Sequence, residues 1–592
     1  MGEMNTLAGG LLGLIAAVGV GCGFVRTAGP VPPRWRLAVA LISGVAIIDW
    51  AVMLVLFLGG GVTAVKAVGA GALLLGTCLL VVFRKHLSFA PGLAIPHKSD
   101  RWFAAVIVAA CALNLFIAVA PSTKIDELHY HMLIPKRVIE DNGLYLYRLP
   151  FEAAIFPQTA YQLGLSTELT VGFPEAGNVV SWGLGVALIL LIAGVAKDLT
   201  GSTTAGWMTG AISAVGLYPA VWYVSSGPHA LGDLAMVTAC LLALLPDTAT
   251  SETTANTRLI LVCLAAYAAV STKISNLPAA GTITLIAVYR TTAQLGWRKA
   301  CGVAAIIWGA FYGPAILWTT LKCGSPLGLA TARLFHSRYF GSDPIEIMES
   351  ARGAAPNALR VELQWLAASF SVGVLVCFGI VAYAACRRER ISMAVGGLVC
   401  GQAMLILWLL PLDFRFFGGL EFVVLVVGAW IFWSSPFGKQ VIAKWAIVLV
   451  GLCLPWLAVQ AYYARPFLKV DLGLVSREDF IDEYVAFSRD FRALDRLLPA
   501  NAVLYAGGRI PSLYAPRPVV FTLDDVRGRG PVYEFFMDGD SLSLTPSLSC
   551  GKTVYQDASA NWEVYRTPGR APEQGSLKVN RCDVAGSIQS RP

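Results

Sequence analysis

Charged residues are scarce in this chain of 592 residues, because Asp, Glu, Lys and Arg together make up only 14% of it. Soluble domains carry about 25% charged residues, so this scarcity excludes an ordinary soluble protein. Hydrophobic residues reach 56%, and uncharged runs of about twenty residues, the length that crosses a bilayer, recur along the chain. The sequence therefore predicts a polytopic α-helical membrane protein.

Several common signals are also missing. The N-terminus, MGEMNTLAGG, lacks the basic start and the small-residue cleavage site of a secretory signal, so we expect it to belong to the first span. We find no internal repeat, no low-complexity segment and no HExxH metal motif. The net charge of +8 follows from membrane topology, so it does not indicate a nucleic-acid partner. Eleven of the thirteen cysteines lie in or beside apolar runs, where cysteine is usually a small buried hydrophobe.

The apolar runs predict about fourteen membrane spans. They cover Thr6–Val25, Leu37–Leu58, Val62–Phe83, Phe103–Ala120, Gly177–Ala196, Thr203–Val224, Leu231–Leu245, Leu259–Thr272, Ile274–Tyr289, Lys299–Leu321, Leu363–Ala385, Ile391–Leu410, Phe417–Trp433 and Val441–Tyr462. The two on either side of Lys273 are short for a hydrocarbon core of roughly 30 Å.

The distribution of Lys and Arg orients these spans. With the N-terminus outside, most basic residues between spans fall in inner loops, as the positive-inside rule requires. This topology places a first outer loop (121–176), a second long outer loop (322–362) and the whole segment after residue 464 on the same outer face. We therefore expect a transmembrane domain at 1–464 and a soluble outer domain at 465–592, in a bacterial-type inner membrane.

The C-terminal segment predicts a small α/β domain. Phe480, Tyr484, Phe487, Phe491 and Leu494 share one face of an expected helix over Ser476–Pro499, with Ser476 as its N-cap. Strand-like runs follow at Ala502–Tyr505 and Val519–Leu523. Cys550 and Cys582 lie in this segment, and on an oxidising outer face they could form a disulfide.

The first outer loop holds the densest polar cluster of the chain. Within twelve residues it gathers Asp126, Glu127, His129, His131, Lys136 and Arg137. On a helical wheel His129, Tyr130, Lys136, Arg137 and Glu140 fall near Asp126, and Leu128, Met132, Pro135 and Ile139 form the opposite stripe. This pattern predicts an interfacial helix whose polar face points to water. Such a helix could carry a site, or only solvated charges.

Several segments resemble the GT-C superfamily of integral-membrane glycosyltransferases, which transfer sugars from polyprenyl-phosphate donors. The superfamily includes the protein O-mannosyltransferases and the aminoarabinose transferase. The resemblance runs in order through DELHYHMLIPK, GDLAMVTACLL, AAVSTKISNLP, CGSPLG, LDFRFFGGLEF and SREDF…LDRLLPANAVLYAGGR. It implies a GT-C-like fold and, for Asp126 and Glu127, the position of the catalytic carboxylate.

The chemistry of such a transfer suits the residue types found. An acceptor hydroxyl needs a carboxylate to take its proton, and we assign Asp126 as general base with Glu127 as support or alternative base. The leaving lipid phosphate needs fixed cations, for which Lys273 and Arg415 at outer span ends are candidates. Both could instead snorkel to the interface.

Other polar residues are expected to contact the acceptor or the donor. These are His129, Tyr130, Lys136, His229, Asp233 and Arg338. Asp233 could instead complement a helix dipole, and Arg338 could belong to a solvated loop above anionic headgroups. No cofactor is required, although Asp126, His129, His131 and His229 could collect a divalent metal such as Mg or Mn.

The sequence thus predicts an inverting glycosyltransferase with a polyprenyl-phosphate-linked sugar donor, a glycan, lipid or protein acceptor and membrane lipids as partners. Inversion is expected because a retaining double displacement would need a second, nucleophilic carboxylate. The main alternative is a multi-span transporter or lipid flippase. Transporters usually contain two related halves with ionisable residues near the bilayer centre. A non-catalytic scaffold is a further alternative.

Overall fold

A computed structural model describes most of the chain. It covers residues 2–28, 31–83, 100–124, 126–146, 148, 154, 161, 164–167, 175–245, 251–340, 369–409, 417–506, 510–522, 530–537, 550–561 and 574–582. Its helical region contains α1 (Gly2–Ala28), α2 (Pro33–Phe57), α3 (Val62–Phe83), α4 (Arg101–Val119), α5 (Leu133–Glu140), α9 (Ala176–Thr200), α10 (Thr203–Ala214), α11 (Leu217–Trp222), α12 (His229–Leu244), α13 (Glu252–Thr272), α14 (Leu277–Leu295), α15 (Trp297–Cys323), α18 (Val372–Cys386), α19 (Arg390–Leu409), α20 (Leu420–Ser434) and α21 (Pro436–Asp471).

Seven helices within the described ranges are long and apolar enough to cross a membrane: α1, α2, α3, α4, α9, α13 and α15. Shorter apolar helices include α12, α18, α19 and α20. The chain is therefore an integral membrane protein of the helical kind, as predicted. The total of fourteen spans stays a prediction.

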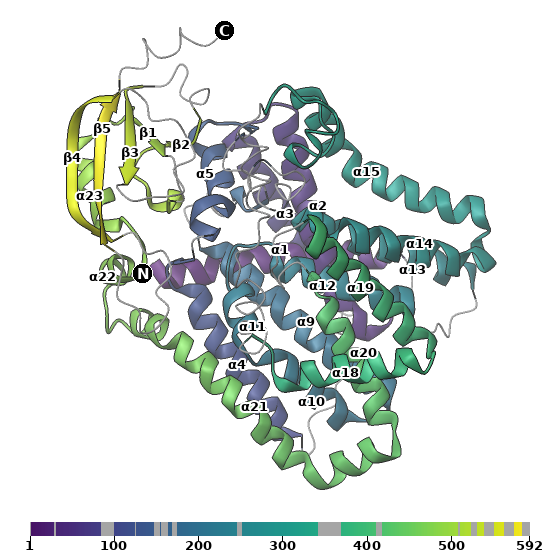
Figure 1. Ribbon diagram of the computed structural model, residues 1–592. Helices are drawn as coiled ribbons and strands as arrows, with labels where there is room; N and C mark the ends of the chain where they lie inside the picture. Colours follow the sequence, from purple (N-terminus) through teal and green to yellow (C-terminus); the bar gives the residue numbers. More distant parts are fainter. Residues whose placement is uncertain are drawn as a thin grey trace.

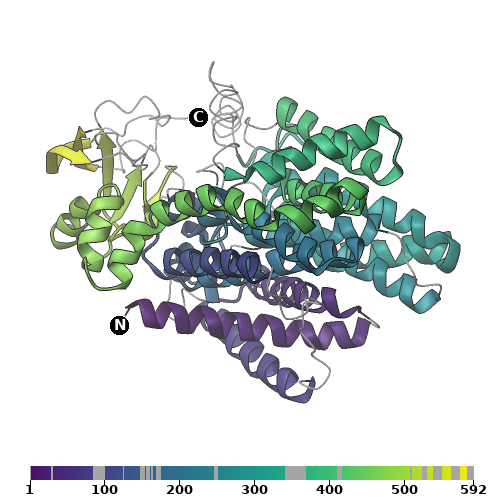
Figure 2. The ribbon, with the colours of Figure 1, turned by 90° about the horizontal axis from the view of Figure 1, so that it is seen from below.

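The helices differ in how deeply they lie in the bundle (Figure 1). In the most apolar 18-residue stretch of each helix, 78% of the residues of α9 and 72% of those of α13 are buried, compared with 11% in α3. Figure 2 shows the helices stacked beside one another, with the strands gathered at one end. A peripheral apolar helix such as α3 suits lipid contact, because lipid tails are as apolar as its side chains.

The predicted span Thr203–Val224 is interrupted. It forms α10 and α11, and Gly216 between them has φ 120°. A Cβ at Gly216 would lie 2.3 Å from the carbonyl oxygen of Ser369, so neither the backbone angle nor the space suits another residue. The break turns α11 so that Tyr218 and, directly after the helix, Tyr223 reach Asp233 of α12.

Two other predictions of element length also change. The helix before Lys273 is α13 with 21 residues, so it is longer than the predicted span, and a 3₁₀ turn (Ile274–Asn276) separates it from α14. Helix α21 is 36 residues long and passes without interruption through the expected domain boundary at residue 464.

The C-terminal region contains α22 (Arg477–Tyr484), α23 (Ser488–Leu497) and a five-stranded sheet. Its strands are β1 (Val503–Ala506), β2 (Val519–Val520), β3 (Val532–Met537), β4 (Cys550–Asn561) and β5 (Gln574–Cys582), in the order β2-β1-β3-β5-β4. β1 pairs in parallel with β2 and β3, and the remaining pairs are antiparallel. A small α/β unit is therefore present, as predicted.

The single helix predicted over Ser476–Pro499 is wrong in one respect. Ser476 caps α22 by accepting a hydrogen bond from the Asp479 amide, as expected. The helix then breaks before α23, because Phe487 adopts a left-handed conformation with φ 60°. The break leaves the Phe487 and Phe491 rings buried against Phe535 of β3. Tertiary packing of aromatic rings thus outweighs the helical periodicity.

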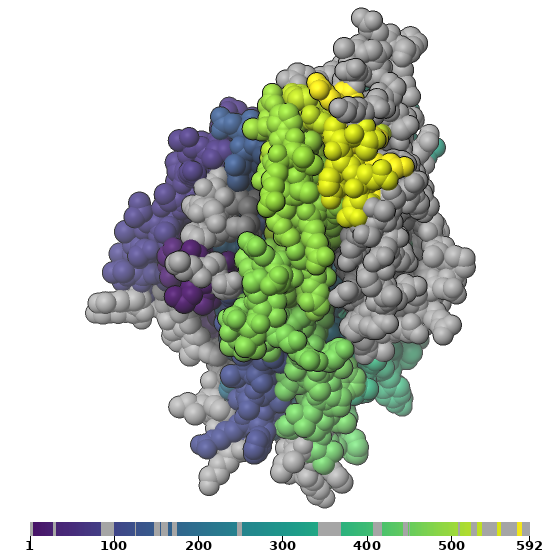
Figure 3. Space-filling view, turned by 90° about the vertical axis from the view of Figure 1, so that its left-hand side faces the viewer, coloured from purple at the N-terminus to yellow at the C-terminus, as the bar shows by residue number. Residues whose placement is uncertain are grey.

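The helical region and the strands are joined along one face. Figure 3 shows the continuous green column from α21 to α23, with the yellow strands beside its upper part. Cys582 is disulfide-bonded, and its Cα partner in the β4–β5 register is Cys550. The other eleven cysteines are free.

Candidate active site

The acidic pair of the first outer loop follows α4 after a segment of six residues, 120–125. Residues Glu127–His131 form a single π-helical turn, in which the Met132 amide donates to the Glu127 carbonyl at 2.9 Å. Such turns are rare and occur frequently at functional sites. Asp126 precedes the turn and is 8% exposed, whereas Glu127 is 2% exposed. The structure therefore buries both carboxylates where α4 ends.

Glu127 is held by donors from two parts of the chain. Its Oε1 accepts from the Ser226 amide at 3.0 Å, and the hydroxyl of Ser122 also donates to it. Burial raises the pKa of Glu127, while the charge of Lys124 and these hydrogen bonds act in the opposite direction. Its carboxylate is thus committed to protein partners.

Lys124 is the buried counter-charge of Glu127. Its ammonium donates to the carbonyl of Val221, beside α11. Burial lowers the pKa of Lys124 to about 8, and Glu127 opposes this shift. Two buried charges that neutralise each other are stable only as a pair, since removing either leaves the other unpaired.

Asn178 in the first turn of α9 completes this cluster. Its amide nitrogen donates to Ser122 Oγ at 3.1 Å, and its amide oxygen accepts from Ser226 Oγ at 2.6 Å. One side chain therefore contacts both serines that bond Glu127, Ser122 through its hydroxyl and Ser226 through its amide. We name Ser122, Lys124, Glu127, Asn178 and Ser226 the loop cluster.

A second polar cluster lies around Asp233 in the first turns of α12. Asp233 Oδ2 accepts from the hydroxyl of Tyr218 at 2.8 Å and from that of Tyr223 at 3.0 Å. Lys273, directly after α13, is near enough to attract the Asp233 charge, and its Nζ lies 3.3 Å from His229 Nε2. We name Tyr218, Tyr223, His229, Asp233 and Lys273, together with Glu421 described below, the helix cluster.

One turn joins the two clusters. In the segment 225–229, the Ser226 amide bonds Glu127 and the His229 imidazole meets Lys273. Between them, a Cβ on Gly227 would lie 3.6 Å from the His131 ring, so this imidazole packs on the same turn. The structure therefore brings Glu127, His229, Asp233 and Lys273 into one continuous region, with Asp126 beside it.

Glu421 is a member of the helix cluster that the sequence analysis did not single out. It is 4% exposed at the start of α20 and near enough to Asp233 for their charges to interact. Gly418 and Gly419 before it have φ 60° and 85°, and a Cβ on Gly419 would lie 2.8 Å from Asp233 Cα. The signal that could have found it is a carboxylate two residues after a Gly-Gly pair at the start of a span.

Arg415, the second predicted phosphate ligand, lies outside the described residues. Arg338 is described and is exposed in the segment after α15. Its neighbour Tyr339 donates to the Leu146 carbonyl at 2.5 Å, and the Arg148 guanidinium lies 4.6 Å from the Tyr339 ring. The second long outer loop therefore packs on the first, but within the described ranges Arg338 does not contact either cluster.

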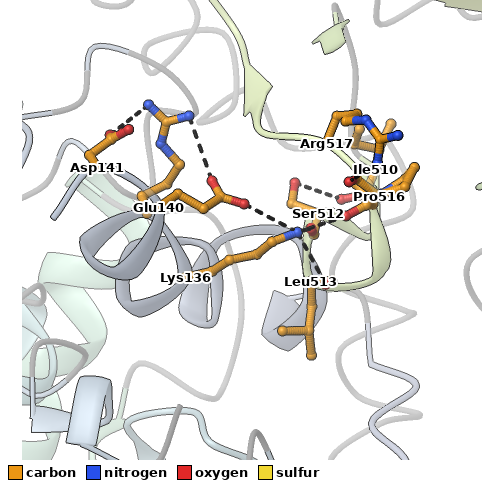
Figure 4. A network of polar contacts seen from close by, with 10 residues as sticks. Lys136, Glu140, Asp141, Ile510, Ser512, Leu513, Pro516 and Arg517 are labelled. Carbon is orange, nitrogen blue, oxygen red and sulfur yellow. Dashed lines mark hydrogen bonds and ion pairs between the residues drawn. The ribbon is translucent and has the colours of Figure 1, made fainter. Parts of the chain in front are cut away.

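The expectation that the polar face of the 126–140 helix points to water is wrong. Glu127, Leu128, His129, Tyr130 and His131 are all buried, as are Pro135 and Arg137. The C-terminal region covers the polar face: His129 Nδ1 donates to the Ile510 carbonyl at 3.1 Å. Lys136 reaches the same region (Figure 4). The sequence pattern showed which face is polar but not which part of the chain covers it.

These contacts do not form a metal site among the described residues. Within the part of the chain that the structure describes, no three His, Cys, Asp or Glu side chains come together in a way that could hold a metal ion. The divalent metal stays an untested prediction.

Comparison with known proteins gives a structural likeness and no sequence match. No protein-family model matches the chain, and no curated protein matches it. Among solved structures, it is similar to ArnT from Cupriavidus metallidurans bound to undecaprenyl phosphate, with a TM-score of 0.49 and 14% sequence identity over 82% of this chain and 98% of that one. At this TM-score and identity the likeness does not assign a function to this chain.

Proposed function

We propose that this chain is a GT-C-type membrane glycosyltransferase that moves a sugar from a polyprenyl-phosphate carrier to a glycan, lipid or protein acceptor. The observation that carries the proposal is the continuity of the two clusters. A buried acidic pair, Asp126 and Glu127, lies one short turn away from a lysine, Lys273, at the end of an apolar helix. Sugar transfer from a lipid phosphate needs these two groups, a base and a fixed cation, close together.

In this proposal Asp126 is the general base and Glu127 positions it. Glu127 already accepts hydrogen bonds from Ser226 and Ser122 and faces Lys124, which suits a positioning role. Asp126 takes the proton of the acceptor hydroxyl while the acceptor oxygen attacks the anomeric carbon. The bond from that carbon to the phosphate oxygen breaks, and the polyprenyl phosphate leaves. A single displacement of this kind inverts the anomeric centre.

Lys273 balances the charge that grows on the leaving phosphate, with Arg415 as a second cation. A fixed ammonium stabilises the transition state more than the ground state, because the negative charge increases as the bond breaks. Asp233 and Glu421 would accept hydrogen bonds from sugar or acceptor hydroxyls beside it. Tyr130, His229 and Arg338 remain candidate contacts of the donor or the acceptor.

The arrangement along α12 supports the proposed outer location of this site. Asp233 lies in its first turns, whereas Arg258 and Arg290, both from predicted inner loops, donate to the last carbonyls of the same helix. A 16-residue helix is about 24 Å long, so the two ends are well separated. We propose that the site, both long loops and the C-terminal region share the outer face of a bacterial-type inner membrane.

Lipid binding tests the phosphate part of this proposal. The purified chain in detergent is heated with a polyprenyl phosphate or with the polyprenol of the same length. We expect the phosphate to raise the melting temperature by several degrees at about 100 times its Kd, and the polyprenol to have little effect. Equal stabilisation by both lipids would contradict a phosphate site. A flippase, the alternative function, would move the lipid across vesicles without forming a glycosidic bond.

A further inference from the structure

The short connection between β1 and β2 in the C-terminal region makes close polar contacts with the first outer loop. It contains a 3₁₀ turn, Ser512–Tyr514. Lys136 of α5 donates from Nζ to three backbone carbonyls around this turn: Ser512 at 2.8 Å, Leu513 at 3.3 Å and Ala515 at 2.9 Å. Figure 4 shows the Lys136 side chain extending from its helix to the turn.

The Lys136 ammonium is well matched to this environment. It has three N–H donors and no acceptor, and the turn presents three carbonyls. Glu140, one helical turn along α5, lies 3.6 Å from the same nitrogen and supplies a counter-charge. Hydrogen bonds from a charged donor are stronger than those between neutral groups. This contact therefore holds α5 firmly against the C-terminal region.

The same turn also contacts the beginning of the catalytic segment. Tyr514 donates from its hydroxyl to the Ser122 carbonyl at 3.0 Å, and the Ile510 carbonyl just before the turn accepts from His129. The contacts at Ser122, His129 and Lys136 lie on both sides of Asp126 and Glu127 in sequence. The turn thus touches the segment before, within and after the π-helical turn.

Apolar packing extends the polar contacts. Tyr130, Leu133, Ile134 and Val138 belong to the same buried cluster as the side chains of α23, β1, β3 and β5. Val52 and Met53 of α2 also belong to this cluster. The helix that follows the acidic pair is therefore part of the hydrophobic core of the C-terminal region.

We propose that the Ser512–Tyr514 turn is a positioning element of the active site, and that Lys136 is the residue through which it orients the Asp126–Glu127 segment. Nothing in the sequence pattern assigns this role, since Lys136 was expected to contact substrate. The proposal rests on the proposed function for its catalytic consequence. Its structural part, that the turn orders residues 127–140, stands by itself.

The consequence for catalysis is specific. A general base must be held in hydrogen-bond reach of the acceptor hydroxyl, and a displacement of about 1 Å can lower the rate a hundredfold. Donor binding depends in this scheme on Lys273 in the helix cluster, which Lys136 does not contact among the described interactions. Loss of the Lys136 contact should therefore lower kcat and leave the donor KM unchanged.

The experiment compares five variants of the full chain in detergent. Lys136→Met removes the donors while keeping the aliphatic stem, and Tyr514→Phe removes only a hydroxyl. The matched controls are Lys469→Met, at an exposed lysine of α21, and Tyr555→Phe, which removes a hydroxyl that donates to Asp490 elsewhere in the C-terminal region. Lys136→Arg serves as a conservative variant, because a guanidinium can still donate to carbonyls.

The first measurement is amide hydrogen exchange over residues 127–140, which needs neither substrate nor activity. We expect exchange about tenfold faster in Lys136→Met, with a smaller increase in Tyr514→Phe and wild-type rates in both controls. Lys136→Arg should lie closer to wild type than Lys136→Met does. Unchanged exchange in Lys136→Met and Tyr514→Phe would overturn the proposal. If Lys136→Met does not fold, Tyr514→Phe and Lys136→Arg decide the question.

The second measurement is sugar transfer at varied concentrations of polyprenyl-phosphate-linked sugar. We expect kcat to fall about tenfold in Lys136→Met with an unchanged donor KM. An increase in donor KM with unchanged exchange would mean that Lys136 contacts the donor, and would overturn the positioning role. Absence of transfer in the wild type would contradict the proposed function, whereas the exchange result would still decide the structural part.

Discussion

The loop cluster around Glu127 and the helix cluster around Asp233 hold buried carboxylates with different donors. Glu127 accepts from the Ser226 backbone amide and the Ser122 hydroxyl and faces Lys124. Asp233 accepts from two tyrosine hydroxyls and lies near Lys273. The loop cluster draws on the segment after α4, the first turn of α9 and the 225–229 turn, and the C-terminal region touches it through Tyr514. The helix cluster draws on apolar helices and the turns at their ends.

This difference separates two tasks. The loop cluster depends on segments that are far apart in sequence, so its geometry depends on how the C-terminal region packs. The helix cluster can form within the helical region alone. We therefore expect substitutions in the loop cluster to change positioning and stability, and substitutions in the helix cluster to change ligand binding.

The largest expected effect distinguishes the two adjacent carboxylates. Asp126→Asn should lower sugar transfer about a thousandfold with little change in melting temperature, because it removes the general base. Glu127→Gln keeps an acceptor for the Ser226 amide but leaves Lys124 buried without its counter-charge, so it should lower the melting temperature clearly. The measurement is single-turnover transfer beside thermal unfolding. Near-normal transfer in Asp126→Asn would remove it from the role of base.

A smaller effect is expected from the two buried lysines. Lys273→Gln should raise the half-saturating concentration of polyprenyl phosphate about tenfold to a hundredfold, since a charged hydrogen bond is lost. It should lower the melting temperature less than Lys124→Gln does, because Asp233 keeps its hydrogen bonds from Tyr218 and Tyr223. Lys124→Gln should instead lower the melting temperature clearly and leave the half-saturating concentration of polyprenyl phosphate unchanged. Binding titrations and thermal unfolding of both variants provide the check. A similar profile for the two lysines would show that the clusters do not divide the tasks in this way.

The smallest expected effect concerns Asp490 in α23, a buried carboxylate outside both clusters. Burial raises its pKa to about 6, with Asp557 in support and the Tyr555 hydroxyl in opposition. The unfolded chain has a pKa of about 3.9 at this residue. The folded chain therefore binds the proton more tightly, so this contribution to stability is full below about pH 4 and is lost as the pH rises through 6.

Asp490→Asn removes this pH dependence. Its melting temperature should exceed that of the wild type by roughly 2–4 °C at pH 7.5, and the difference should be much smaller at pH 4.5. Thermal unfolding of the full chain at the two pH values is the measurement. An equal difference at both pH values would mean that the charge of Asp490 has no part in the effect.

Much of the helical region could be predicted, because long apolar runs have few alternatives in a membrane protein. Spans such as Val62–Phe83 and Phe103–Ala120 agree with α3 and α4 within a few residues. The prediction was wrong where a single residue controls the path. Gly216 divides one predicted span and Phe487 divides the predicted amphipathic helix, and hydrophobic periodicity continues across both positions.

The candidate site was predicted in part. The acidic pair was found because carboxylates are conspicuous in an apolar sequence, and Asp233 and Lys273 were found because they lie at span ends. Glu421, Lys124 and Asn178 were not singled out, since each is an ordinary polar residue until its neighbours are known. Their importance comes from contacts with distant segments, such as Asn178 with Ser122 and Ser226.

The sequence by itself determined the class of protein, the approximate spans and the polar stretch from Asp126 to Arg137. These follow from composition and local periodicity, which depend only on neighbouring residues. Only the tertiary structure decided that the polar face of this stretch meets carbonyls of the Ser512–Tyr514 turn rather than water. A buried ammonium is stable only where acceptors replace its water, and those acceptors belong to backbone whose position the fold alone determines.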